Sequence, residues 1–538
     1  MEIELKLVLP GPEAESVVVA QIREHGYQVK ELDPVRNVDL YLDTFDWSLL
    51  KNKLSLRYRL SNGEAMYTLK SLDTIKDGIA RRMETEVRLD GPVDAPAELP
   101  VKGIRKLIEG IISPRKLLEH IQVGTDRHRY EVLSPEEAEI ELVFDASNFS
   151  LRGLHQKRRL QKVYEMEAEI HQGSATALES LASFLSAAFH YPPSVASKLE
   201  VAITRFKLAP RPKKLPEKLK VRLEDRLDLA LRKILAYNFQ RFQEQLPGVH
   251  QDIDTEFVHQ ARVATRRMRS ALRLFHEAIP QSAVTYLGKE LKWLGGKFGT
   301  VRDLDVFLLN LSRFKPQVKH FPSKKKKALE QWLEKYRRPP FKALREALEL
   351  SRYKTFERRF TQFLERLLPA RPRAPLAVKR VREIAPLMIT EKFESAIEQG
   401  RKVLAKPKLK QFHALRIQMK RLRYAVEFMA PAYEGVLTPF IERTVEIQDC
   451  LGELQDTVFT RGFVEFLLDD WKGKLVDPDL LFILGEIYQL QTEIAAARRK
   501  RFDKIWERFS SQETVNLLRD ILLPQSKHLN APDSLSSA

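Results

Sequence analysis

The sequence predicts an antiparallel α+β domain followed by an all-α domain, on three observations. Within residues 1–205, apolar and polar side chains alternate with period two over several segments, as in strands that have one apolar face. After a Pro- and Lys-rich segment at 209–216, the apolar period becomes 3.6, which is typical of amphipathic helices. A pattern of His and Arg residues in this second part recurs at an offset of 154 residues, which indicates a duplicated helical unit.

The elements of the first part follow from the local period. Strands are expected over 1–6, 54–60, 65–70, 82–89, 139–145 and 163–170. Helices are expected over 12–24, 100–109 and 175–188. Many strands with few helices between them favour an antiparallel sheet.

The second part reads as helices throughout. They are expected over 223–245, 259–278, 286–298, 328–336, 391–403, 408–429, 439–452 and 480–509. A Pro-rich segment at 369–375 lies between the two copies of the repeat. Two copies are too few for a solenoid, so a pair of packed bundles is expected.

Charge divides the chain in the same way. The 538 residues have a net charge of +18, but residues 1–210 carry 28 Lys and Arg against 32 Asp and Glu, whereas residues 211–538 carry 63 against 41. The strongly basic second part predicts a polyanionic partner. A single cysteine, Cys450, excludes an internal disulfide framework and a clustered thiolate metal site. No apolar run is long enough to cross a bilayer and the start lacks the apolar core of a signal peptide, so a cytoplasmic location is expected.

The first six residues combine acids and a base on one strand face. In a strand, Glu2, Glu4 and Lys6 point to the same side, opposite Ile3 and Leu5. Such a set suits a site that holds a divalent metal and a phosphate together. A solvated edge strand is the alternative.

Other predicted strands repeat this arrangement. Charged or polar side chains share one face within each of the following sets: Arg57 and Arg59; Thr68 and Lys70; Arg82, Glu84, Glu86 and Arg88; Arg127 and Arg129; Glu139, Glu141 and Asp145; Glu165, Glu167 and Glu169. In an open sheet this face is simply solvated, and in a closed barrel it lines a lumen. The periodicity alone leaves both arrangements open.

Two helices carry rows of bases. Spacings of three and four place His259, Arg262, Arg266, Arg269 and Arg273 on one helix face, and they place His413, Arg416, Lys420 and Arg423 on another. A row of like charges repels itself unless an anion binds it. A solvated basic face, or neutralisation by acids of neighbouring helices, is the alternative.

The repeat includes a second motif, since Gly299 to Asp303 matches Gly452 to Asp456. A helical repeat with His-x-x-Arg-x-x-x-Arg/Lys-Arg-Met/Leu-Arg and a later Gly-x-x-x-Asp resembles the CHAD domain, over roughly residues 217–525. The resemblance implies two pseudo-symmetric helical bundles, about 217–368 and 376–525, around a groove that binds inorganic polyphosphate. The residues that it places at this groove are His259, Arg262, Arg266, Arg267, Arg269, Arg273, His413, Arg416, Lys420, Arg421 and Arg423.

The first domain also resembles a known family. The initial Glu-x-Glu-x-Lys, then Leu-Arg-x-Arg, Thr-x-Lys, a late Glu-x-Glu-x-Glu strand and Ser197-Lys198 resemble the CYTH family of triphosphate tunnel metalloenzymes, over about residues 1–206. This resemblance implies an eight-stranded antiparallel tunnel that takes up a triphosphate with Mg²⁺ or Mn²⁺. Residues 207–216 are then a linker and residues 526–538 a tail.

The resemblance also implies roles for individual residues. The metal ligands would be Glu2, Glu4, Glu165, Glu167 and Glu169. The phosphate-binding bases would be Lys6, Arg57, Arg59, Lys70, Arg82, Arg127, Arg129 and Lys198. Glu141 and Asp145 are further metal or water-positioning candidates, so the catalytic set is Glu2, Glu4, Lys6, Glu141, Asp145 and Glu167.

We therefore expect an inorganic triphosphatase that a CHAD domain tethers to polyphosphate, in the cytoplasm and at polyphosphate granules. Tripolyphosphate is the expected substrate, and Mg²⁺ or Mn²⁺ the expected cofactor. Two other classes stay open: another CYTH enzyme, such as a thiamine triphosphatase or an adenylate cyclase, and a non-enzymatic polyphosphate-binding scaffold. Nucleic acid is a weaker expectation because no aromatic residues are interleaved with the basic rows.

Overall fold

The computed structural model describes residues 4–72, 84–113, 115–135, 137–152, 162–194, 196–208, 219–314, 323–366, 368–473 and 476–522. The chain divides into two compact units, residues 1–213 and 214–538. Each unit has its own core, and each is described by itself.

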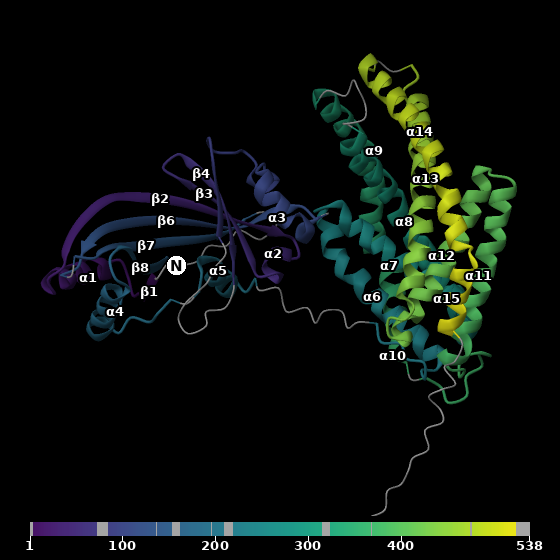
Figure 1. Cartoon of the computed structure of the whole chain (residues 1–538), viewed down its shortest axis with the longest axis horizontal. Helices are drawn as coiled ribbons and strands as arrows, with labels where there is room; N and C mark the ends of the chain where they lie inside the picture. Colours follow the sequence, from purple (N-terminus) through teal and green to yellow (C-terminus); the bar gives the residue numbers. More distant parts are fainter. Residues whose placement is uncertain are drawn as a thin grey trace, which may run out of the picture. The chain divides into compact units, whose positions relative to one another are not determined.

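The strands of the first unit form one antiparallel sheet of eight strands (Figure 1). They are β1 (Glu4–Leu9), β2 (Gln28–Thr44), β3 (Leu54–Ser61), β4 (Glu64–Ser71), β5 (Glu84–Leu89), β6 (Leu117–Leu133), β7 (Glu139–Leu151) and β8 (Val163–Gln172). The spatial order is β1-β8-β7-β6-β2-β3-β4-β5, so that β1 and β5 lie at opposite ends of the hydrogen-bonded order. This arrangement confirms the predicted fold class, with a sheet that is tunnel-like but not closed by a ladder between described residues of β1 and β5.

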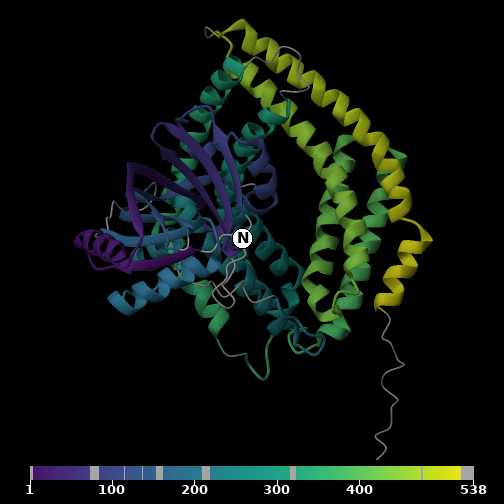
Figure 2. The ribbon, with the colours of Figure 1, turned by 60° about the vertical axis from the view of Figure 1, so that its left-hand side comes forward.

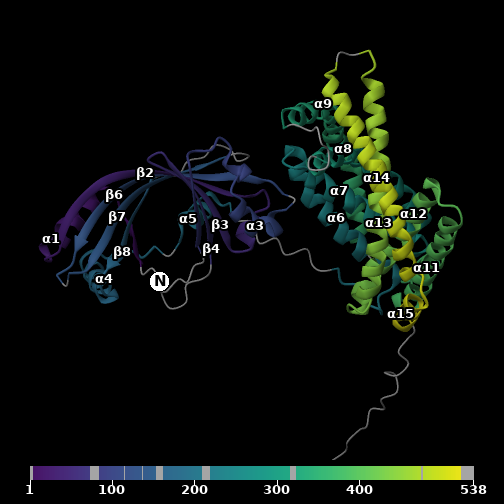
Figure 3. The same ribbon diagram turned by 45° about the horizontal axis from the view of Figure 1, so that its top comes forward.

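Helices pack on this curved sheet (Figure 3). They are α1 (Glu13–Glu24), α2 (Ser48–Lys51), α3 (Lys102–Ile112), α4 (Ala175–Phe189) and α5 (Lys198–Phe206), with a 3-10 turn at Pro96–Glu98. On the outer face, the buried apolar residues of α1 and α4 pack on β1, β6, β7 and β8, and those of α3 pack on β2, β3 and β4. Since strand residues alternate between faces, the charged residues of these strands point to the concave face. The apolar residues of α5 pack on that concave face, because Ile121 and Val123 in their core lie on the same face of β6 as Arg127.

The two longest strands, β2 and β6, were not among the strands predicted from the sequence. Both have 17 residues. In β2 the apolar pattern is interrupted by Pro34 and by acidic residues, and the pairing register of β2 with β6 shifts between Leu32 and Val35. In β6 the run Gly124 to Arg129 is polar on both faces. These strands bridge the middle of the sheet, and tertiary pairing holds them where local periodicity is weak.

The second unit is helical. Its helices are α6 (Leu227–Gln251), α7 (Thr255–Leu274), α8 (Gln281–Phe314), α9 (Ser323–Glu349), α10 (Ser351–Glu365), α11 (Val381–Ala405), α12 (Leu409–Met429), α13 (Thr438–Asp470), α14 (Pro478–Phe509) and α15 (Gln512–Leu522), with 3-10 turns at His276–Ala278 and Ala430–Tyr433. Several are longer than the periodicity predicted; α8 and α13 extend well past 298 and 452, the ends expected for them. Figure 2 shows α14, in yellow, running beside α13.

The duplication is visible in the helices. The starts of α6 and α11, Leu227 and Val381, and the starts of α7 and α12, Thr255 and Leu409, are each 154 residues apart. Arg226 and Arg380, the residues before the first helix of each copy, pair in an isolated antiparallel bridge. Because symmetry-related residues meet there, the two copies pack as a pseudo-symmetric pair, with α7 against α12.

In the part of the chain that the structure describes, no helix has both the length and the apolar character needed to cross a membrane.

Candidate functional site

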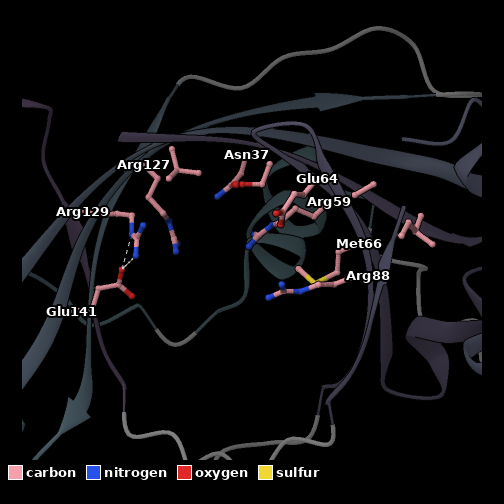
Figure 4. A pocket seen from close by; sticks show the side chains of 12 residues that line it. Asn37, Arg59, Glu64, Met66, Arg88, Arg127, Arg129 and Glu141 are labelled. Atoms are coloured by element: carbon pink, nitrogen blue, oxygen red, sulfur yellow. Dashed lines mark hydrogen bonds and ion pairs between the residues drawn. The ribbon is translucent and has the colours of Figure 1, made fainter. Parts of the chain in front are cut away.

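Two cavities lie on the concave charged face of the sheet. One, of about 520 Å³, is lined by residues of β1 to β6, β8 and α5, and the other, of about 450 Å³, by residues of β2 to β7. Arg59 and Arg127 line both, so the cavities are adjoining parts of one lumen. Figure 4 shows the second part, where Arg59, Arg88 and Arg127 extend into the open space. The sequence left a solvated sheet and a lumen both open, and the structure has the lumen.

A cluster of alternating charges occupies the wall formed by β1, β6, β7, β8 and α5. Lys6 Nζ lies 2.7 Å from Glu167 Oε1. Arg127 donates two hydrogen bonds of 2.7 Å to Asp145 and a third, of 2.9 Å, to Glu167 Oε2. Lys198 Nζ donates to Asp145 Oδ2 at 2.5 Å. Three bases are therefore held by two carboxylates inside the lumen.

The opposite wall, on β2 to β5, has a second group of pairs. Arg59 binds Asp39 through two hydrogen bonds of 2.7 and 2.9 Å, and the Asp39 side chain is fully buried. Arg57 donates to Thr68 Oγ1 at 3.3 Å, while its buried Nε has no hydrogen-bond partner among the described residues. This Nε lies 4.0 Å from Asp39 Oδ1, so Arg57 and Arg59 are both ion-paired with Asp39, and the Arg57 side chain lines the lumen where an anion would bind.

Further bases predicted from the sequence lie in the same lumen. Lys70 pairs with Glu84 at 2.7 Å, and Arg129 pairs with Glu141 at 2.7 Å. Glu84, one of the same-face charges of its strand, is the acidic partner of Lys70. Every predicted phosphate-binding base that is described has an acidic or hydroxyl partner within this lumen.

The local sequence explains how Lys198 reaches the lumen. Ser197 caps α5, since its hydroxyl accepts from the Glu200 N–H, and Glu200 Oε2 accepts from the Ser197 N–H at 2.8 Å. This reciprocal capping box fixes where the helix begins. Lys198 is then the first helical residue, and only 7% of it is exposed.

The cluster keeps its acids ionised. Burial alone would raise the pKa of the Glu167 carboxyl, but Lys198, Lys6 and Arg127 hold that pKa well below its ordinary value. Burial also opposes ionisation of Asp145, and the hydrogen bond from Arg127 and the charge of Lys198 lower its pKa in turn. Carboxylates with such depressed pKa values are charged at neutral pH and are available to a cation.

The carboxylates of β8 fit a divalent metal ion. Glu165 is 1% exposed; its Oε1 accepts from Ser194 at 2.9 Å, and its Oε2 has no hydrogen-bond partner among the described residues. A buried carboxylate oxygen without a partner is costly, and a hard cation would satisfy it. Glu167 and Glu169 follow on the same strand face and line the lumen. Within the described ranges, no three His, Cys, Asp or Glu side chains already converge as a metal site.

The structure gives no side-chain contacts for three of the predicted site residues. Glu2 and Arg82 lie outside the described residues. Glu4 is described only as a strand residue, opposite Glu169 in the pairing of β1 with β8. Their roles stay predictions.

The structure adds lumen residues that sequence reasoning missed. Asp39, Asn37 and Tyr41 come from β2, which was not recognised as a strand. Arg88 and Glu86 were noted as same-face charges but received no role, and both line the lumen. The alternation of polar and apolar residues at 37–42 is the sequence feature from which these three residues of β2 could have been predicted.

In the helical unit, α7 and α12 bring several of the predicted bases together. Burial and the charges of Arg416, Arg266 and Arg262 lower the pKa of Lys420 to about 7. Burial, Arg302, Arg266 and Arg262 lower the pKa of His259 to about 4. The lowered pKa of Lys420 results from cations of both repeat copies, whereas that of His259 results from cations of the first copy alone. Since Arg262 and Arg266 of the first copy act on Lys420 and Arg416 of the second, the two basic rows share one strongly positive surface. Arg302, from α8, was not predicted.

Two other predicted polyphosphate-binding residues have an acidic partner. Arg267 and Arg423 both pair with Glu427, and Arg267 lies over the rings of Tyr424 and Phe428. Arg273, His413 and Arg421 are exposed, and the Arg269 side chain lies beside Gly295 of α8. The residues that share the positive surface are His259, Arg262, Arg266, Arg302, Arg416 and Lys420.

The fold and the site together define a class: an antiparallel sheet curved around a charged lumen, followed by a duplicated helical unit with a basic surface. Comparison with protein families agrees with this class. The CYTH domain model matches residues 1–199, and the CHAD domain model matches residues 233–465. The chain is therefore a CYTH–CHAD protein, with the two domains in that order.

Solved structures with similar folds cover one domain or the other. The CHAD domain from the plant Ricinus communis is 22% identical over 54% of this chain and 93% of its own, with a TM-score of 0.43. PptA from Streptomyces chartreusis is 16% identical over 53% and 100%, with a TM-score of 0.42. A Hippeastrum protein for which a dominant triphosphatase activity is described is 21% identical over 38% and 96%, with a TM-score of 0.28. No curated protein matches the chain.

Proposed function

We propose that the CYTH domain hydrolyses inorganic tripolyphosphate to phosphate and pyrophosphate with Mg²⁺ or Mn²⁺, and that the CHAD domain binds polyphosphate. The observation that carries the proposal is the charge cluster of Lys6, Arg127, Asp145, Glu167 and Lys198. It places bases that suit phosphoryl oxygens directly beside carboxylates that suit a divalent cation.

The ion pairs between bases and acids of the lumen stabilise it without substrate, and they keep both kinds of group where a polyanion and its metal would bind. Buried charges are costly when unpaired, so without substrate the bases are held by the acids. A triphosphate with its metal would supply a cation to the carboxylates and phosphate oxygens to the bases, so each group would keep a partner of opposite charge. Glu165, Glu167 and Glu169 would hold the metal, which supplies charge neutralisation and activation of a water molecule.

The residues of the chain account for the remaining requirements of hydrolysis. A water oxygen bonds to a terminal phosphorus, the bond from that phosphorus to its bridging oxygen breaks, and the water proton passes to solvent or to a lumen carboxylate. Arg57, Arg59 and Arg127 orient the chain and offset charge that develops on the equatorial oxygens.

The lining of the lumen favours an inorganic substrate over a nucleotide or thiamine triphosphate. Among the described residues that line the two cavities, the only aromatic one is Tyr41. It is 7% exposed, and burial raises the pKa of its hydroxyl to about 12. A base or a thiazole ring would therefore lack an exposed aromatic face on which to stack.

The test is phosphate release from tripolyphosphate by the full chain with saturating Mg²⁺ or Mn²⁺. Glu167→Gln should lower turnover at least about a hundredfold, as expected for loss of a charged group that acts in the transition state. Glu179→Gln on the exposed side of α4 is the matched control and should leave turnover within about twofold. Near-normal turnover by Glu167→Gln would overturn the assignment.

A further inference from the structure

The two repeat copies of the CHAD domain differ at the basic surface. Five positions are basic in both copies, at an offset of 154: His259 and His413, Arg262 and Arg416, Arg266 and Lys420, Arg267 and Arg421, and Arg269 and Arg423. Beside them, Asp303 of α8 and Asp456 of α13 occupy matching positions at an offset of 153. Because the two copies share these residues, the positions at which they differ indicate how their binding of an anion differs.

The first difference lies next to each histidine. Arg302 of the first copy corresponds to Gln455 of the second. The charge of Arg302 helps to lower the pKa of His259. In the second copy, His413 Nδ1 and Gln455 Oε1 lie 2.9 Å apart, so an internal hydrogen bond replaces a cation.

The second difference lies at the end of the basic row. Arg273 of α7 corresponds to Glu427 of α12. Glu427 pairs with Arg423 of its own row and also with Arg267 of the first copy. The acid at this position therefore neutralises Arg423 of the second row and Arg267 of the first copy, whereas the first row ends in an exposed arginine.

Unsatisfied buried atoms occur on the first copy. His259 Nδ1, Arg266 Nε and Arg302 Nη1 are buried and have no hydrogen-bond partner among the described residues. Their counterparts in the second copy, His413, Lys420 and Gln455, have no such atom in the described structure. Leaving a buried polar atom unpaired is costly, and phosphate oxygens are acceptors of the kind that the guanidinium N–H groups of Arg266 and Arg302 lack.

We propose that His259, Arg262, Arg266 and Arg302 form the primary phosphate-binding site of the CHAD domain, and that the second copy contributes a weaker site. This inference rests on the proposed binding of polyphosphate by the CHAD domain and assigns it to one side of the repeat. Arg302, which no sequence motif indicated, is its distinguishing residue.

The experiment measures the affinity of the full chain for long-chain inorganic polyphosphate at pH 8 and fixed salt. Arg302→Gln gives the first copy the residue of the second, and it should weaken binding at least about tenfold. Arg416→Gln, on the second copy, also removes an arginine that is charged at this pH, and it should weaken binding less than about threefold. Arg358→Gln on the exposed side of α10 removes the same charge away from the site and should have the smallest effect.

A variant that is expected to gain affinity is also needed, because misfolding can lower affinity but does not raise it. Gln455→Arg gives the second copy the residue of the first, and it should tighten binding at least about threefold and steepen the salt dependence, because each added phosphate contact releases counterions. Equal losses in Arg302→Gln and Arg416→Gln, or no tightening in Gln455→Arg, would overturn the unequal-site proposal while leaving polyphosphate binding intact. No binding by the parent chain would instead overturn the proposed function itself.

Discussion

Charged side chains in the lumen set the ionisation of the neighbouring groups with which they pair. Lys198 sits at the start of α5, donates to Asp145 and, after burial, is the largest influence on the pKa of Glu167. Its effect is to keep Glu167 ionised, because a neighbouring ammonium stabilises the carboxylate form. Lys198 was predicted only as a phosphate-binding base, and the structure gives it this second contact.

We expect Lys198→Ala to lower tripolyphosphate turnover about a hundredfold and to change its pH profile. Activity that needs ionised Glu167 is present above the pKa of Glu167 and is lost as the pH falls through it. Removal of Lys198 raises that pKa, so the acidic limb of the profile should move to higher pH. Lys30→Ala, which removes an exposed lysine of β2, is the control. An unchanged acidic limb would show that Lys198 does not set the charge of Glu167.

Lys420 predicts a pH dependence in the CHAD domain. Its pKa of about 7 results from burial and from Arg416, Arg266 and Arg262, with Asp456 acting in the opposite direction. The ammonium is therefore largely neutral at pH 8 and charged at pH 6, and an anion binds the charged form better. Polyphosphate affinity should rise as the pH is lowered from 8 to 6, by up to about tenfold for one such group.

The Lys420→Arg variant tests this assignment directly. An arginine stays charged throughout the range, so the affinity of the variant should depend much less on pH. If the parent and the variant show the same pH dependence, measured by titration calorimetry at both values, another group is responsible.

At the scale of helices and strands, a buried ion-pair network holds the first copy of the repeat together. Arg337 of α9 is 5% exposed and binds Asp305 of α8 at 2.6 Å and Asp252, after α6, at 2.8 Å. Asp305 is fully buried. One guanidinium of α9 thus joins α8 and the residue that follows α6.

Arg337→Ala should lower the free energy of unfolding of the helical unit by about 3–5 kcal/mol, because it leaves a buried carboxylate unpaired. Arg338→Ala, at the exposed neighbouring position, should change it by less than about 0.5 kcal/mol. Denaturant unfolding followed by the helical circular dichroism signal measures both. Similar values for the two variants would mean that the network adds little.

The comparison of sequence and structure is instructive at the same scale. Strands with clear alternation, such as β3, β4 and β8, and helices with a steady apolar stripe, such as α7, α12 and α14, were predicted. β2 and β6 were not, because Pro34, Gly124 and polar residues on both faces weaken the period, and pairing across the sheet fixes them instead. Asp39 was missed with β2, whereas the charges of β8 were found because they alternate strictly.

The positive surface of the CHAD domain shows a second limit. Helical spacing placed His259, Arg262 and Arg266 on one face, which agrees with their position in the structure. It could not show that Glu427 neutralises Arg423, or that Arg302 joins the surface from α8, because these contacts link different helices.

At the scale of the whole molecule, the two compact units have separate cores, which predicts that the activities separate. Residues 1–208 alone should turn over tripolyphosphate at a rate within about threefold of the full chain, which is a difference of under roughly 1 kcal/mol in activation free energy. Residues 217–538 should be helical, bind polyphosphate and release no phosphate. A well-folded first fragment that is inert, beside an active full chain, would mean that the two units share one site.

The central claim is that the lumen of the CYTH domain is an inorganic triphosphatase site, and a substrate screen tests it most directly. Phosphate release is measured from tripolyphosphate, ATP, thiamine triphosphate and long-chain polyphosphate, each with Mg²⁺ and with Mn²⁺, with cyclic AMP assayed in the ATP samples. We predict that tripolyphosphate gives the highest kcat/KM, that the products are phosphate and pyrophosphate, and that Glu167→Gln abolishes the reaction. Faster turnover of ATP or thiamine triphosphate, formation of cyclic AMP as the main product, or no metal-dependent release from tripolyphosphate would contradict the account.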